Sequence, residues 1–131
     1  MNDGNAPRGA LTIRTVAMPA DTNTAGDIFG GWVLSQMDIA AGVAAAEYAN
    51  ARVVTVGIEA MSFLKPVRVG DILCVYCEII RVGRSSMAVN TEAWVSRRYS
   101  AKRLQVTHGV LTFVALDNTG GKMAVPSLSA D

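Results

Sequence analysis

Charged residues are scarce in this sequence. They make up 18% of its 131 residues, against about 25% in an average soluble domain, while half of the chain is hydrophobic. High apolar content excludes a disordered chain. A net charge of only +1 excludes a generally basic nucleic-acid-binding domain, so we expect no nucleic-acid partner. The apolar excess leaves two explanations: the chain enters a membrane, or it buries surface against other copies of itself.

Cysteine and histidine are also scarce, with two and one residues respectively. Cys74 and Cys77 have a C-x-x-C spacing but lie in an apolar run typical of a strand, where positions i and i+3 point to opposite faces. With His108 as the only histidine, four zinc ligands are hard to assemble. We therefore expect two buried structural thiols, no metal and no cofactor, and an ordinary strand histidine at His108.

A long hydrophobic run with enough length to span a bilayer occurs once, at 30–49. It contains Gln36, Asp38 and Glu47, and an aspartate in the middle of a membrane helix costs about 2.5–3.5 kcal/mol. We predict instead a helix of a soluble protein, apolar on nearly all sides and therefore buried nearly all round. The first ten residues contain no apolar segment typical of a signal peptide, so we expect a cytoplasmic protein and no membrane partner.

The rest of the chain is rich in strand signals. Alternating or β-branched runs between turn residues predict five strands, at 11–18, 52–64, 72–82, 86–96 and 104–116. Short connections favour antiparallel pairing. We predict one α+β domain over residues 1–131, in which a long antiparallel sheet curls around one central helix. Residues 1–9 and about 122–131 are expected to be flexible tails.

The unusual residue of the predicted helix is Asp38, because a carboxylate on an apolar face is costly without partners. Such an acid beside a special loop is a candidate functional residue. The alternative is a structural aspartate bonded to another backbone segment.

The segment before the helix is polar and glycine-rich and ends in Gly30 and Gly31. Free amides at a helix start carry partial positive charge and can bind a carbonyl oxygen or an oxyanion. The alternative is ordinary capping, with Asp27 as N-cap and Asn23 shaping the turn.

The run MPADTNTAGDIFGGWVLSQMD at 18–38 resembles the hotdog-fold acyl-CoA thioesterases of the YciA-type bacterial branch. The stretches RVVTVGIEAMSFLKPVRVGD and YCEIIRVGRSSMAVNTEAWV are similar to the same family, and the likeness spans roughly residues 11–116. The resemblance implies the hotdog fold and hydrolysis of acyl-coenzyme A to a free acid and coenzyme A. It implies that Asp38 is the catalytic acid, Asn23 the loop asparagine of the active site, and the amide of Gly30 or Gly31 the group that polarises the carbonyl. It also implies a homo-oligomer, at least a dimer and, as a trimer of dimers, a hexamer.

Chemistry and helix geometry add two points. A carboxylate such as Asp38 can activate water as a base or attack the thioester carbonyl as a nucleophile. The sequence does not distinguish between these two routes. Asp38 lies seven residues after Gly31, which is about 10.5 Å along the same helix. This separation is long for a carboxylate and an amide of one chain that must act on the same thioester. We therefore hypothesise a site shared between two protomers, also the family's arrangement.

Six of the twelve basic residues lie between positions 81 and 103, where Glu92 is the only acid. Because coenzyme A carries several phosphates, this basic zone is a candidate binding region. The alternative is a solvated hairpin edge. The predicted coenzyme A residues are Gly83, Arg84, Ser85, Ser86, Arg97 and Arg98.

Two other functions remain open. A hydratase or dehydratase on the same fold usually needs an Asp/His pair, and no histidine lies near Asp38 in the sequence. A non-catalytic acyl-CoA sensor or oligomeric module is the second alternative.

Overall fold

The structure, a computed structural model, describes residues 6–97 and 99–128. Its elements follow the order β1 (Ala10–Val16), a short 3-10 turn η2 (Pro19–Asp21), α1 (Gly30–Ala49), β2 (Arg52–Phe63), β3 (Ile72–Val82), β4 (Ser86–Ser96) and β5 (Arg103–Leu116). The predicted helix and all five predicted strands are present, and α1, β3 and β4 begin and end where the sequence predicts.

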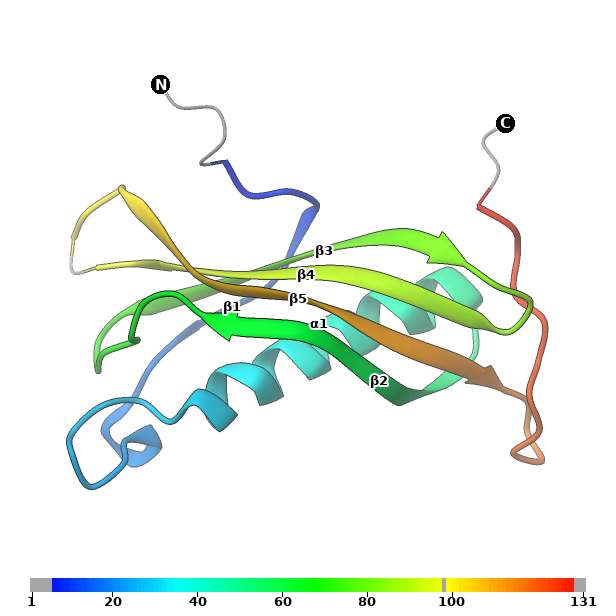
Figure 1. Cartoon of the computed structure of the whole chain (residues 1–131), viewed down its shortest axis with the longest axis horizontal. Helices are drawn as coiled ribbons and strands as arrows, with labels where there is room; N and C mark the ends of the chain where they lie inside the picture. Colours follow the sequence, from blue (N-terminus) through cyan, green and yellow to red (C-terminus); the bar gives the residue numbers. More distant parts are fainter. Residues whose placement is uncertain (1–5, 98, 129–131) are drawn as a thin grey trace.

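The five strands form one antiparallel sheet in the order β1-β3-β4-β5-β2. Helix α1 lies along one face of this sheet and contacts every strand (Figure 1). Strands β1 and β2 are the edges, and two register irregularities bend β2. This arrangement confirms the predicted α+β fold with one central helix.

The core lies between α1 and the inner face of the sheet. The side chains of β4 alternate between the two faces of the sheet, and those of one alternating set are all buried: Met87, Val89, Thr91, Ala93 and Val95. Small residues of the helix permit close packing, since a Cβ added to Gly42 would lie 3.4 Å from the ring of Phe113 on β5. The alanine-rich composition of α1 thus allows sheet side chains to approach the helix backbone.

Burial of α1 on nearly all sides was a wrong expectation for a single chain. Ile39 is 54% exposed and Val43 is 43% exposed, because no segment of the described chain covers the side of α1 that faces away from the sheet. The edge strand β2 is apolar and exposed as well, at Val54 and Val56. No helix in the described part of the chain is long and apolar enough to cross a membrane.

The two cysteines are free and buried on opposite faces of β3, as predicted. Cys77 belongs to the main core, where burial raises the pKa of its thiol, whereas Cys74 packs with Tyr76 and Trp94 on the outer face. The separation of the two side chains follows from the alternation of a strand.

Both predicted tails are partly described. The N–H of Arg8 donates to Glu92 on the outer face (3.2 Å), and the N–H of Met123 donates to the carbonyl of Ala115 (3.0 Å). The predicted flexibility of 1–5 and 129–131 concerns residues outside those that the structure describes.

Candidate active site

The start of α1 is not capped by a side chain. The N-cap position is Phe29, and Asp27, which the alternative interpretation placed in that role, lies two residues too early. Ile28 explains the difference: its side chain is 7% exposed and its N–H donates to the carbonyl of Val67 (3.2 Å). Burying Ile28 keeps the chain extended for two residues after Asp27, so the helix starts without a capping oxygen.

The first amides of the helix are consequently open. No described residue accepts a hydrogen bond from the N–H of Gly30 or Gly31. A Cβ at Gly31 would have no neighbour within 4 Å, while one at Gly30 would meet the ring of Phe63 at 3.5 Å. Two free donors at the positive end of the helix dipole can therefore receive an oxygen that carries negative charge.

Asn23 organises the loop that precedes this helix start. Its Oδ1 accepts hydrogen bonds from the N–H groups of Ala25 (2.9 Å) and Asp27 (3.1 Å), which is the geometry of an Asx turn. Gly26, with φ of +90°, supplies the left-handed residue that this turn needs. Because the side-chain oxygen is occupied within the loop, the amide nitrogen of Asn23 remains as the donor for a ligand.

Asp38 lies on α1 where the helix passes the edge strand β2, and its side chain is half-buried. Its Oδ1 accepts a hydrogen bond from the hydroxyl of Thr55 on β2 (2.7 Å). The structural alternative for Asp38 was a bond to a backbone segment, whereas the observed partner is an exposed side-chain hydroxyl. The second carboxylate oxygen has no partner among residues 6–97 and 99–128, so it is free to interact with water or substrate.

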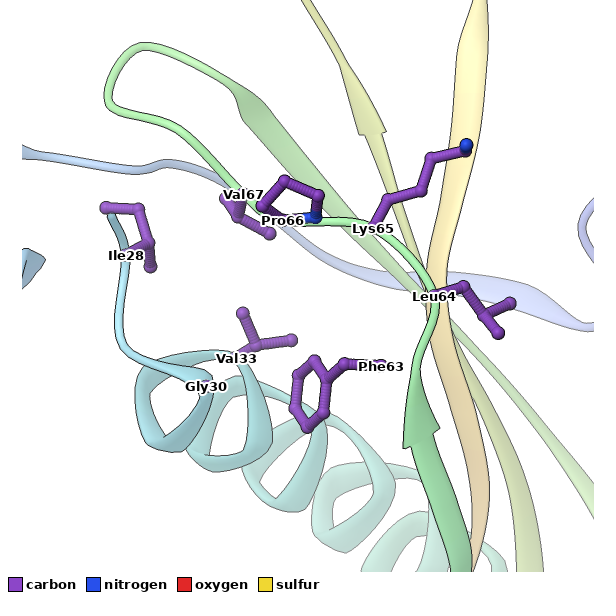
Figure 2. Close-up of a pocket in the computed structure, with 8 residues that line it drawn as sticks. All are labelled: Ile28, Gly30, Val33, Phe63, Leu64, Lys65, Pro66 and Val67. Carbon is purple, nitrogen blue, oxygen red and sulfur yellow. The ribbon is translucent and has the colours of Figure 1, made fainter. Parts of the chain in front are cut away.

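A pocket of about 370 Å³ opens beside the helix start. Ile28, Val33 and Phe63 line its interior between α1 and the segment 63–67, while Leu64 and Lys65 point outward (Figure 2). Of the side chains in the first two turns of α1, that of Val33 lines the pocket. The 63–67 wall was missed, because only the tertiary fold brings the end of β2 to the start of α1.

The predicted coenzyme A residues are divided between the two ends of the sheet. Gly83–Ser86 form the β3–β4 turn, near the C-terminal end of α1 and far from Gly30 of the same chain (Figure 1). Arg97 lies at the end that holds the helix start, but its Nε donates to Asp71 (3.1 Å) and its terminal nitrogen to the carbonyl of Pro66 (2.7 Å). Arg98 lies outside the described residues.

Among the described residues, no hydrogen bond joins Asp38 to the loop of Asn23 within one chain. The protomer thus presents an apolar pocket with two free amides at the helix start, and a carboxylate two turns further along. The family model of the thioesterase superfamily matches residues 25–101 of this chain. The chain belongs to the thioesterase superfamily.

One relative within this superfamily is the acyl-CoA thioester hydrolase YciA of Escherichia coli strain K12. The two sequences are 47% identical over 125 residues, which cover 93% of this chain and 95% of that protein. The likeness therefore includes nearly the whole of both chains.

Solved thioesterases share the fold. The hexameric thioesterase y2039 of Yersinia pestis has a TM-score of 0.88 and 51% identity, covering 93% of this chain and 99% of that one. A hexameric hotdog fold thioesterase of Campylobacter jejuni has a TM-score of 0.84 and 39% identity, covering 90% and 91%. The fold predicted here, the hotdog fold, is thereby confirmed.

A third structure was determined with ligands. It is an acyl-CoA hydrolase of Staphylococcus aureus in complex with butyryl coenzyme A, coenzyme A and coenzyme A disulfide, with a TM-score of 0.83 and 34% identity, covering 88% of this chain and 70% of that one. The same enzyme was also solved as an asparagine-to-alanine variant with coenzyme A and as an aspartate-to-alanine variant.

Proposed function

We propose that this chain is an acyl-CoA thioesterase, which hydrolyses the thioester of acyl-coenzyme A to a free carboxylic acid and coenzyme A. The observation that carries the proposal is the uncapped helix start, where the amides of Gly30 and Gly31 are free and Gly30 lines an apolar pocket. The close likeness to acyl-CoA thioester hydrolases supports it over most of the chain. A pocket for the acyl part beside donors for the carbonyl oxygen is what a thioester needs.

In the proposed reaction, the N–H of Gly30 or Gly31 donates to the thioester carbonyl oxygen and stabilises the negative charge that develops there. Loss of one such donor raises the barrier by about 3 kcal/mol in comparable sites. The free amide nitrogen of Asn23 orients the substrate or the water.

Asp38 supplies the carboxylate in either of two routes. As a base it takes a proton from water, the water oxygen attacks the carbonyl carbon, the C–S bond breaks and the proton passes to the sulfur of coenzyme A. As a nucleophile it attacks the carbon itself, coenzyme A leaves, and water hydrolyses the anhydride. The hydroxyl of Thr55 holds one carboxylate oxygen in both routes.

We propose further that each site is shared between two protomers. Asp38 borders the edge strand β2, whose outer backbone edge has no strand beside it in the described chain, and Val54, Val56 and Ile39 next to this border are exposed. A long apolar edge strand pairs readily with another chain. Antiparallel pairing of two β2 strands would bring Asp38 of one copy towards the Asn23 loop of the other, within a homo-oligomer that we propose is a hexamer, as in the relative from Yersinia pestis.

The β3–β4 turn fits the same arrangement. In one chain it lies far from the helix start, so Gly83, Ser85 and Ser86 would serve the site of a neighbouring protomer. The guanidinium of Arg84 forms no ion pair with a described residue and is available for a phosphate. For the compartment we propose the cytoplasm, which the two free buried thiols support.

Release of free thiol from acetyl-, butyryl- and palmitoyl-coenzyme A tests the activity and gives the chain-length preference. Binding of coenzyme A without release of thiol from any acyl-CoA would favour the non-catalytic sensor instead.

Mixing Asp38→Ala chains with Asn23→Ala chains tests the shared site. Each variant alone is expected to be inactive, and heterodimers are expected to recover part of the activity, since one of their two sites is intact. Absence of recovery in chains shown to mix would contradict sharing.

A further inference from the structure

The C-terminal segment 123–126 is bonded to the rest of the domain. Its backbone runs back along the end of β5, where the N–H of Met123 donates to the carbonyl of Ala115 (3.0 Å). Two residues later, the N–H of Val125 donates to the carbonyl of Arg84 in the β3–β4 turn (2.9 Å). Figure 1 shows this segment, in red, passing beside that turn. The chain beyond the last strand is therefore tied to a turn that lies much earlier in the sequence.

Further contacts hold this segment in place. The hydroxyl of Tyr48, in the last turn of α1, donates to the carbonyl of Pro126 (2.7 Å). The side chains of Met123 and Val125 pack against the core. Pro126 also favours an extended backbone at the residue before it, which is Val125. The N–H of Val125 is thus held in position by its own side chain and by the residue on its C-terminal side.

The hydrogen bond from Val125 sets the orientation of one peptide group in the β3–β4 turn. The carbonyl of Arg84 and the N–H of Ser85 belong to the same planar trans peptide and point in opposite directions. Because this carbonyl is bonded to Val125, the N–H of Ser85 points away from the C-terminal segment. The next peptide is held as well, since the carbonyl of Ser85 accepts a hydrogen bond from the N–H of Ala115 (2.9 Å). Both central carbonyl groups of the turn are therefore paired within the chain.

The N–H groups of the same turn are open. No residue of the ranges 6–97 and 99–128 accepts a hydrogen bond from the N–H of Arg84 or from that of Ser85. The side chain of Arg84 is exposed, and its guanidinium forms no ion pair with a described residue. Open amides beside a guanidinium offer hydrogen-bond donors to a phosphate, while the carbonyl oxygens that would repel it are directed into the chain.

We propose that Val125 is a positioning residue for substrate binding, because its N–H holds the peptide group that directs the N–H of Ser85 towards a phosphate of the substrate. Val125 does not touch the substrate itself. The segment 123–126 is then a part of the binding apparatus as well as a cover for the core. This inference rests on the proposed thioesterase function, in which the β3–β4 turn serves the site of a neighbouring protomer.

The test separates the N–H of Val125 from its side chain. Val125→Pro removes the N–H, whereas the control Val125→Ala keeps the N–H and shortens the side chain that packs on the core. Both are measured with butyryl-coenzyme A and with S-butyryl-pantetheine, which has the same thioester but no phosphate. Val125→Pro is expected to raise KM for butyryl-coenzyme A by about fivefold, the effect of one hydrogen bond, and to leave kcat and KM for the pantetheine substrate unchanged. Val125→Ala is expected to lower the melting temperature and to keep both KM values.

Two shortened chains repeat the comparison without a new proline, and they decide the question if Val125→Pro does not fold. A chain that ends at Ala124 lacks the N–H of Val125, whereas a chain that ends at Ser127 keeps this N–H and the carbonyl of Pro126 that accepts from Tyr48. The first is expected to show the raised KM for butyryl-coenzyme A, and the second the KM of the full chain.

Three results would overturn the inference. An unchanged KM for butyryl-coenzyme A, in Val125→Pro or in the chain that ends at Ala124, would show that the segment only covers the core. An equal rise in KM for both substrates would place its effect on the shared thioester part. A wild-type chain that cleaves neither substrate would refute the proposed function and the inference with it, an outcome that differs from the first two because there the wild type is active.

Discussion

The two ends of α1 are built in opposite ways. At the C-terminal end, Asn50 adopts the left-handed conformation (φ 52°, ψ 46°) and its N–H closes the last turn on the carbonyl of Ala46, which also accepts from Ala51 (3.3 Å). At the N-terminal end no side chain caps the helix, two glycines follow one another with free amides, and the first of them, Gly30, lines a pocket. The C-terminal end thus pairs its backbone carbonyl within the chain, whereas the N-terminal end leaves backbone N–H donors without an acceptor.

This difference separates stability from chemistry along a single helix. A missing N-cap costs about 0.5–2 kcal/mol, so the open end lowers the stability of the free protomer. A bound ligand can offset this cost when one of its oxygen atoms accepts a hydrogen bond from the free amides. We therefore expect substitutions in the N-terminal half of α1 to change activity more than stability, and substitutions at its C-terminal end to do the reverse.

The largest effect is expected for Asp38→Asn. The substitution keeps the size of the side chain and its bond to Thr55 but removes the base or nucleophile, so kcat/KM should fall by roughly 10²–10⁴-fold. Thermal unfolding should change little, because the residue is only half-buried. Glu47→Gln removes an exposed acid from the same helix and should leave both quantities unchanged. Full activity in Asp38→Asn would refute the assigned role.

A smaller loss is expected for Thr55→Val, which removes the hydroxyl that donates to Asp38 (2.7 Å). Hydrogen bonds to charged groups contribute about 1.5–3 kcal/mol, so a reduction of kcat by about ten- to hundredfold is expected. Thr55 is a positioning residue, and KM should therefore stay near its original value. Thr55→Ser restores the hydroxyl and should restore kcat; if it does not, the methyl group and the packing of β2 matter instead.

The elements that depend on local sequence patterns were predicted correctly. An alanine-rich apolar run and four long β-branched or alternating runs defined α1 and the long strands, and the Asn- and Gly-rich stretch before Gly30 marked the special loop. The alternative interpretation, in which Asp27 caps the helix, was wrong because burial of Ile28 in the core outweighs capping.

Features that depend on the pairing of distant strands were not predictable. Thr55 meets Asp38 only because β2 pairs with β5 at the edge of the sheet, next to the side of the helix that carries Asp38. Arg97 was expected to bind coenzyme A, yet it bonds to Asp71, 26 positions away in the chain. The pocket beside Gly30 likewise arises from segments far apart in the sequence, since 63–67 forms one wall of it and the start of α1 the other.

Gly31→Ala gives a sharper test of the open helix end, because it is expected to lower activity without lowering the melting temperature. A Cβ at this position meets no atom within 4 Å, and alanine stabilises a helix by up to about 1 kcal/mol relative to glycine. The melting temperature should therefore stay level or rise. Activity should fall if the thioester carbonyl approaches this backbone, as measured by kcat/KM. Unchanged activity would assign the donor to Gly30, whose neighbour is the ring of Phe63.

The smallest effect is expected at the other end of α1, for Asn50. Asparagine tolerates the left-handed conformation, glycine tolerates it better, and alanine is strained there by about 1 kcal/mol. Asn50→Ala should lower the melting temperature by a few degrees, whereas Asn50→Gly should leave it nearly unchanged. Both variants should keep the kcat/KM of the wild type, because about 30 Å of helix separates Asn50 from Gly30. If Asn50→Ala instead reduced kcat without a change in melting temperature, the closed end of the helix would also take part in the chemistry, and the division along α1 would be wrong.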